Sequence, residues 1–207
     1  MHTLFLQSKD ARYLASFDGA IALVDGQPLI HLLNRMGCDT DHTHRATAVD
    51  LVHPILRAAA ADGKRVFVIG QEEMVLLQAI SRLRSQHRML EISGHHGFFD
   101  TEGDDATHVV AAANDFGADL VLVGLGSPKS EVWIDQNRDR FDASVVWACG
   151  ALMEYVAGAV PTPPRWSGQL GIEWLFRLAH DPRRFLTRYF VEPVALLARV
   201  TARKILR

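Results

Sequence analysis

The chain has 207 residues, of which 48% are hydrophobic and 22% charged, a composition typical of one α/β domain with room for an appendage. No apolar run approaches the roughly 20 residues that span a bilayer, and no basic-then-apolar signal peptide opens the chain, so we expect a cytoplasmic protein. The two cysteines, Cys38 and Cys149, form neither a disulfide framework nor a metal-binding spacing.

The charge of the chain is distributed unevenly along its length. Residues 177–207 contain eight Lys or Arg against two acidic residues, which leaves this segment at +6 and the rest of the chain at −8. A basic end on an acidic body suggests an anionic membrane surface or a nucleic acid as its partner, and the alternative is an ordinary solvated helix face. No RNA-binding signature accompanies the charges, so we do not expect nucleic acid to be the partner.

The first apolar run, residues 20–24, predicts a buried strand that ends on Asp25-Gly26. Ligands of open α/β sheets bind outside the carboxyl ends of the strands, which makes Asp25 a candidate catalytic carboxylate. The alternative is a plain Asp-Gly turn. His42 and His44 follow in a polar loop, and because no third ligand is in view we interpret them as solvated rather than as a metal site.

Four more predicted strands alternate with predicted helices over residues 47–150. The strands are expected at residues 65–69, 89–93, 120–123 and 144–148, and helices at 47–61, 72–86, up to 116 and from 128. Strands that alternate with helices at this spacing indicate a doubly wound parallel sheet, because right-handed crossovers are almost obligatory. The amino-acid composition changes near three prolines at 161–164. This change predicts an α/β domain over 1–160 and a basic helical appendage over 161–207.

The stretch around Gly124 and Lys129 has the pattern of a phosphate-binding turn. Continuous apolar residues at 120–123 predict a strand buried on both faces, and the loop Gly124-Leu-Gly126 leads into a helix for which Ser127 is the expected N-cap and Pro128 the first residue. The helix N-terminus offers N–H groups and a positive dipole end to an anion. The alternative is a well-capped crossover helix without a ligand.

The loop over residues 94–100 is unusually rich in rings. Its aromatic faces are expected to stack on a base or a sugar, whereas the alternative places Phe98 and Phe99 in the core beneath the loop. His95 or His96 would hydrogen-bond a phosphate or face water.

Taken together, these motifs resemble the WecG/TagA/CpsF family of bacterial glycosyltransferases, and the resemblance covers about residues 20–190. They follow one another in a single order: Asp25-Gly26, Arg45-Ala-Thr-Ala-Val-Asp-Leu51, Val66-Phe-Val-Ile-Gly70, Gly97-Phe-Phe99, Gly124-Leu-Gly-Ser-Pro-Lys129 with Glu131, Ala157-Gly158, Pro163 or Pro164 with Trp166, and Gly171-Ile-Glu-Trp-Leu-Phe-Arg177 with Asp181-Pro-Arg183 and Arg188-Tyr189.

The resemblance implies a Rossmann-like parallel sheet with helices on both faces and a C-terminal, membrane-associating helical appendage. It implies transfer of a hexose, N-acetylmannosamine-like or glucose-like, from a UDP-sugar to a polyprenyl-diphosphate-linked saccharide in cell-surface polysaccharide synthesis. The reaction would be inverting and would need no metal and no other cofactor. The enzyme would sit on the inner face of the cell membrane, held at the anionic surface by its C-terminal tail, and a homo-oligomer is left open.

The resemblance also assigns roles to individual residues. Asp25 matches the proposed general base, and Arg45 matches an arginine of the catalytic site. The arginines of the appendage would stabilise the leaving diphosphate or contact the acceptor or the membrane: Arg177, Arg183, Arg184 and Arg188. The expected donor-binding residues are Gly70, Gly124, Gly126, Ser127, Pro128, Lys129, Ser130 and Glu131. Without an acidic metal motif, such cations and the helix N-terminus would balance the charge of the departing nucleoside diphosphate.

Three departures from the family pattern point to reduced activity. Position 130 is usually glutamine and here is Ser130, position 48 is usually glycine and here is Ala48, and the first strand that normally precedes Asp25-Gly26 is not found. A non-catalytic, membrane-recruited member of the family is therefore the alternative. A dinucleotide oxidoreductase is disfavoured because Lys129 stands where the third glycine of that fingerprint is required.

Overall fold

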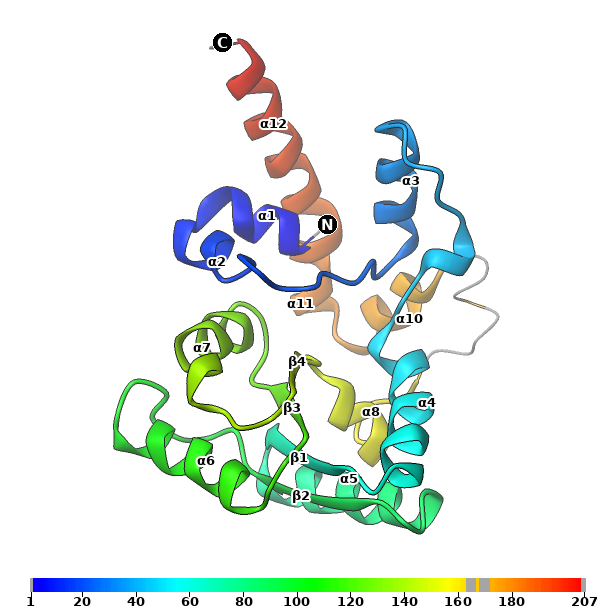
Figure 1. Cartoon of the computed structure of the whole chain (residues 1–207). Coiled ribbons are helices and arrows are strands. Elements are labelled where there is room, and N and C mark those ends of the chain that lie inside the picture. The colour runs from blue at the N-terminus through cyan, green and yellow to red at the C-terminus, as the bar shows by residue number, and fades with distance from the viewer. Residues whose placement is uncertain (1, 163–166, 168–171, 206–207) are drawn as a thin grey trace. The chain divides into compact units, whose positions relative to one another are not determined.

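The computed structural model describes residues 2–162, 167 and 172–205 (Figure 1). It divides into two compact units, one built from residues 48–162 and the other from residues 1–47 together with 163–207. Among the described residues, no helix combines the length and the apolar character that crossing a bilayer requires.

The unit of residues 48–162 is organised around a parallel sheet with the strand order β2-β1-β3-β4. In register, Val66 of β1 pairs with Leu120 of β3, and Leu120 pairs with Val145 of β4. The strands lie where the sequence predicts them, β2 beginning two residues later than expected: β1 (Arg65–Gly70), β2 (Glu91–His95), β3 (Leu120–Gly124) and β4 (Val145–Ala148). The predicted parallel α/β fold is confirmed.

Helices cover both faces of this sheet because alternate residues of its central strands point to opposite sides. Val68 and Leu122 belong to one core cluster, whereas Ile69 and Val123 belong to the other. The first cluster is completed by α4 (Ala48–Ala61), α5 (Glu73–Gln86) and α8 (Leu152–Ala157). The second is completed by α6 (Asp104–Asp115), α7 (Lys129–Asn137) and Phe141, which follows the short helix η2 (Arg138–Arg140).

The prediction of a fifth strand at residues 20–24 is wrong. The segment is irregular, and the side chain of Ile21 is 92% exposed. Its apolar composition favours burial, but a strand also needs a neighbour with which to form a hydrogen-bonded ladder. The described part of the chain provides no strand beside it, and in place of a ladder the segment has isolated backbone bonds, from the Ala20 N–H to the Phe17 carbonyl at 3.0 Å and from the Ala46 N–H to the Val24 carbonyl at 2.8 Å.

The other unit joins the two ends of the chain. Arg199 donates to the Ser8 carbonyl at 3.3 Å and lies over the Phe5 ring, and His2 Nδ1 is 2.6 Å from a Glu192 carboxylate oxygen. These contacts dock the last helix on the first. The helices are α1 (His2–Lys9), α2 (Ala11–Ala15), α3 (Gln27–Arg35), η1 (His42–His44), α10 (Glu173–His180), α11 (Pro182–Leu186), the π-helical turn η3 (Thr187–Val191) and α12 (Glu192–Ile205).

A pair of histidines joins α4 to the end of α5 and makes stability depend on pH. His53 Nδ1 and His87 Nε2 lie 3.1 Å apart, and the two rings are stacked. Burial, and then the positive charge of His53 and Arg57, hold the pKa of His87 below its usual 6.5. The folded protein therefore binds fewer protons than the unfolded chain, so stability is lost as the pH falls below 6.5.

We expect His87→Gln to flatten this pH dependence because glutamine keeps a hydrogen-bonding group but does not titrate. The measurement is the melting temperature of both proteins between about pH 7.5 and about pH 5.5, where the wild type should lose more than the variant. His108→Gln, at an exposed position of α6, is the matched control and should melt as the wild type does. Parallel curves for wild type and His87→Gln would contradict the assignment.

Candidate functional site at the carboxyl ends of the strands

The strand order places a topological switch point between β1 and β3. From β1 the chain moves to β2 on one side and then returns to β3 on the other side. Ligands of open α/β sheets bind in the crevice outside the carboxyl ends of the strands at such a point. Gly70 and Gly124, two of the predicted donor-binding residues, are register partners at the carboxyl ends of these two strands.

These glycines allow the strand ends to pack backbone against backbone. Gly70 has a φ of +147°, and a Cβ placed on it would lie 2.7 Å from the carbonyl carbon and oxygen of Gly124. A Cβ on Gly124 would in turn lie 2.9 Å from the Gly150 carbonyl oxygen. Only glycine fits such positions without moving the backbone. The exits of β1, β3 and β4 therefore form a surface without side chains at its centre, which we call the glycine floor.

Gln71 bridges the edges of the glycine floor and was not predicted from the sequence. Its amide donates from Nε2 to the Gly124 carbonyl at 3.3 Å, and its own carbonyl accepts from the Gly97 N–H at 2.8 Å. Its φ of +70° is left-handed, which costs a residue with a side chain about 1–2 kcal/mol. Strain of this kind concentrates at functional sites. The only signal in the sequence is a polar residue directly after the glycine that ends β1.

The loop after β3 leads into α7 with a different cap from the one predicted. Pro128, after a cis peptide bond, is the N-cap residue, and α7 begins at Lys129. The expected cap, Ser127, instead donates its hydroxyl to the Glu131 carboxylate. A hydrogen bond to an ionised carboxylate is stronger than one between neutral groups, which explains why the hydroxyl turns away from the backbone. Lys129 is exposed in the first turn of this helix.

Ser130 closes the same loop from inside. Its side chain is 1% exposed, and its Oγ accepts from the Leu125 N–H at 2.9 Å. The Ser130 N–H donates to the Gly126 carbonyl at 2.8 Å, so both ends of the loop are tied to one residue. The short hydroxyl of Ser130 thus holds the loop in place.

The two predicted catalytic residues belong to the unit of residues 1–47 and 163–207, where they flank one backbone hydrogen bond. Asp25 follows Val24 and Arg45 precedes Ala46, the two residues joined by the backbone bond of 2.8 Å described above. The side chain of Asp25 is exposed and that of Arg45 is half-buried. Gly26, the N-cap residue of α3, has a φ of +95° and turns the chain directly after Asp25.

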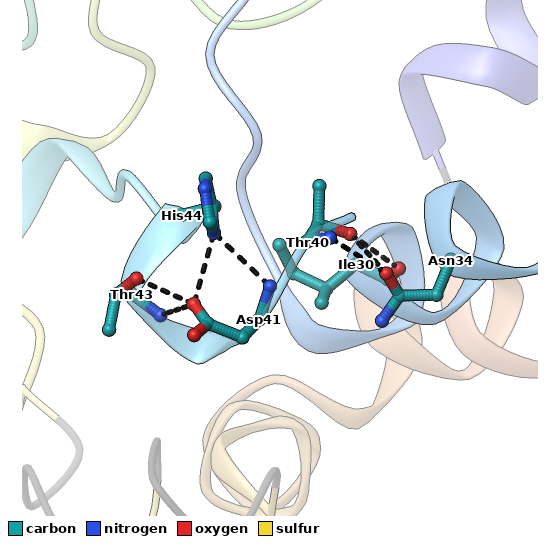
Figure 2. Close-up of polar contacts among 6 residues, drawn as sticks. All are labelled: Ile30, Asn34, Thr40, Asp41, Thr43 and His44. Atoms are coloured by element: carbon teal, nitrogen blue, oxygen red, sulfur yellow. Dashed lines mark hydrogen bonds and ion pairs between the residues drawn. The ribbon is translucent and has the colours of Figure 1, made fainter. Parts of the chain in front are cut away.

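A polar loop with several internal hydrogen bonds connects α3 to Arg45 (Figure 2). Asn34 Oδ1 accepts from the Thr40 N–H at 2.9 Å and from the Thr40 hydroxyl at 2.7 Å. Asp41 Oδ1 accepts from the Thr43 hydroxyl and N–H and lies 3.0 Å from His44 Nδ1. These hydrogen bonds lower the pKa of Asp41 to about 2. His44 is exposed, as predicted, but is bonded to this carboxylate.

The arginines predicted to meet the diphosphate lie on the C-terminal helices. Arg183 is exposed on α11, and Arg188 is half-buried in η3, near enough to His2 to lower its pKa together with the larger effect of burial. The side chains of Arg177 and Arg184 lie outside the described residues, as do Pro163, Pro164 and Trp166. Within the described residues no group of three or more His, Cys, Asp or Glu side chains is placed to hold a metal ion.

The helices that carry these arginines also expose apolar side chains. Trp174 of α10 packs edge-to-face on Tyr189 and Phe190, with ring centroids 6.0 and 6.3 Å apart, which joins α10 to η3. Contiguous exposed apolar side chains of this kind mark interaction surfaces. The exposed members, which we call the apolar surface, are Trp174, Leu175, Phe176, Leu186, Phe190, Val191, Val194 and Leu197.

A parallel α/β sheet with a glycine floor and a helix N-terminus at its switch point has the arrangement at which open α/β sheets bind their ligands. The chain belongs to the glycosyl transferase WecG/TagA/CpsF family, whose model matches residues 1–207. The resemblance read from the sequence is thereby confirmed.

Relatives of the chain include proteins of Staphylococcus aureus. Proteins of strains MW2, NCTC 8325 and MRSA252 are each 30% identical to it over 141 residues, which are 68% of this chain and 54% of the relative. All three are named N-acetylglucosaminyldiphosphoundecaprenol N-acetyl-β-D-mannosaminyltransferase. The matched region thus spans about half the length of these relatives.

Proposed function

We propose that the chain is a hexosyltransferase that moves a sugar, N-acetylmannosamine or a glucose-like hexose, from a UDP-sugar to a polyprenyl-diphosphate-linked saccharide during cell-surface polysaccharide synthesis. The observation that carries the proposal is the glycine floor beside the N-terminus of α7 in a member of this family. The names of the relatives support the acceptor class, since each is a mannosaminyltransferase acting on N-acetylglucosaminyldiphosphoundecaprenol.

The proposed donor site lies on the floor, with the diphosphate against residues 124–129. Backbone approaches closely where Gly70 and Gly124 have no side chain, and the first turn of α7 presents N–H groups and the Lys129 ammonium. Loss of the nucleoside diphosphate leaves negative charge that these groups, Arg45 and the C-terminal arginines would balance. In this scheme the reaction proceeds without a metal ion.

Asp25 is the proposed general base. In this role the exposed carboxylate would take the proton of an acceptor hydroxyl as that hydroxyl attacks the anomeric carbon. Attack and departure in one displacement would invert the anomeric configuration.

We expect Lys129→Ala to weaken donor binding about 10- to 100-fold, because one hydrogen bond to a charged group is worth about 1.5–3 kcal/mol. The measurement is the KM for the UDP-sugar, with kcat changing less. Lys129→Arg, which keeps the charge at this exposed position, is the matched control and should stay near the wild type. An unchanged donor KM for Lys129→Ala, or a donor complex with its diphosphate far from this loop, would refute the placement.

The experiment that tests the function itself is a transfer assay. Purified protein is incubated with a panel of UDP-sugars and short-chain polyprenyl-diphosphate-linked acceptors, and released UDP is measured. We expect release that depends on both donor and acceptor. Binding of a UDP-sugar without release from any pair would instead identify a non-catalytic member of the family.

We further propose that the C-terminal helices attach the protein to the anionic inner face of the cell membrane, where the lipid-linked acceptor resides. The apolar surface and the basic side chains of Arg183 and Arg199 are exposed on the same group of helices, α10 to α12. Apolar burial in the headgroup region and attraction to anionic lipid add up in such a helix. The alternative occupant of this surface is a second copy of the chain.

A further inference from the structure

The loop that follows β2 reaches across the end of β1 and lies on the glycine floor. The Gly97 N–H donates to the Gln71 carbonyl at 2.8 Å, and a Cβ on Gly97 would lie 2.9 Å from the Gln71 nitrogen and from the Gly70 Cα. Strands of a sheet are about 4.8 Å apart, so β2 itself is about two strand spacings from β3. Gly97 therefore carries the loop over the end of β1, from the edge of the sheet toward the switch point.

A chain of aromatic contacts fixes this loop to the helix that begins at the proposed diphosphate site. His95 packs edge-to-face on Phe99, Phe99 packs on Trp133 of α7, and both pairs have ring centroids 5.7 Å apart. Trp133 is 1% exposed and packs in turn on Phe141. The buried Trp133 ring thus joins the loop to α7.

The two phenylalanines of the loop have opposite environments. Phe99 packs against the core, whereas Phe98 is 76% exposed. Phe99 is therefore the core residue of the pair, and Phe98 is the ring that is free of the core. An exposed ring on a loop anchored at both Gly97 and Phe99 is a preformed flat surface at the edge of the glycine floor.

The two histidines present hydrogen-bonding groups of opposite kind. His95 Nδ1 is 2.8 Å from the His96 carbonyl oxygen, which can only accept, so Nδ1 carries the proton and Nε2 of the neutral ring is an acceptor. The Phe98 N–H donates to His96 Nδ1 at 3.3 Å, so in the neutral ring of His96 the proton is on Nε2, a donor. The two rings are neighbours, with centroids 4.4 Å apart.

We propose that residues 94–100 form the nucleobase subsite of the donor and that they select uracil. The Phe98 ring stacks on the base, His95 Nε2 accepts from the uracil N3–H, and His96 Nε2–H donates to the uracil O4 carbonyl, the position at which cytosine carries its amine. Cytosine presents an acceptor at N3 and a donor at the neighbouring amine, which is the reverse pattern and leaves both histidines unmatched. This inference rests on the proposed function, because it assigns the base of the same donor.

The test is equilibrium binding of UDP, CDP and ADP to the full chain by calorimetry, in the absence of acceptor. The wild type should prefer UDP, and Phe98→Ala should weaken UDP binding about tenfold, since base–aromatic stacking is worth about 1–3 kcal/mol. UMP should be weakened by the same factor. Met89→Ala, an equally exposed apolar position just before β2, is the matched control and should bind as the wild type.

The histidine roles are read from the ratio of UDP to CDP affinity. His96→Phe keeps a ring and removes the donor, and His95→Phe removes the acceptor, so each should bring the ratio toward one. Equal binding of the three nucleotides by the wild type, or unchanged UDP affinity in Phe98→Ala, would overturn the subsite. Uracil-selective binding without sugar transfer would contradict the proposed transferase activity and support the nucleobase subsite. Sugar transfer without a preference for the base would support the activity and contradict the subsite.

Discussion

Asp25→Asn is expected to lower turnover by at least about 100-fold, the range of general base catalysis by one residue. Asparagine keeps the size and one hydrogen-bonding oxygen of the side chain but cannot take a proton. Because the Asp25 side chain is exposed, the melting temperature should stay within about 1 °C of the wild type, as surface substitutions usually do. The measurement is UDP release at saturating donor and acceptor.

The matched control for this variant is Asp39→Asn. Asp39 is also exposed and belongs to the same unit, in the loop before Thr40. It should keep turnover near that of the wild type. Near-normal turnover in Asp25→Asn would remove this carboxylate from the mechanism, and equal losses in both variants would indicate a general effect of surface charge.

The sheet was predictable because the apolar pattern of its sequence matches the burial of its strands. Residues 120–123 are continuous and apolar because β3 is covered on both faces, by one core cluster through Leu122 and by the other through Val123. The same pattern at residues 20–24 gave a wrong strand. An apolar run reports what a segment would bury, whereas strand formation depends on a neighbour that the run itself does not encode.

The candidate site was predictable only where its chemistry depends on residue type. Gly70, Gly124 and Lys129 stand out as glycines and a cation at strand and helix ends, and the structure places the glycines at the switch point. Gln71 has a left-handed backbone and contacts the end of β3 and the loop after β2, and its local sequence predicts neither feature. Ser130 is similar, since its bond to Leu125 exists only once the loop has closed.

The C-terminal helices carry both docking contacts and exposed apolar side chains, so a test of membrane binding has to change the second without disturbing the first. α12 docks on α1 through Glu192 and Arg199, so deleting the tail would uncover α1 and disturb its unit. Val191 and Val194, at 59% and 68% exposed, lie three residues apart on the outer side of the same segment. Substitution there changes the apolar surface and leaves the docking contacts in place.

We therefore expect the double variant Val191→Glu, Val194→Glu to reduce sedimentation with anionic liposomes about 100-fold. Each valine would lose about 1.5 kcal/mol of apolar burial, and the added carboxylates would be repelled by the anionic surface. Met74→Glu with Leu77→Glu places two carboxylates at the same spacing on exposed positions of α5 and should still sediment. Transfer to a membrane-embedded acceptor should fall with sedimentation, while transfer to a short-chain soluble acceptor should persist. If the Val191 and Val194 variant binds liposomes as the wild type does, the apolar surface is not the membrane contact, and a concentration-dependent change in its oligomeric state would assign that surface to a second copy.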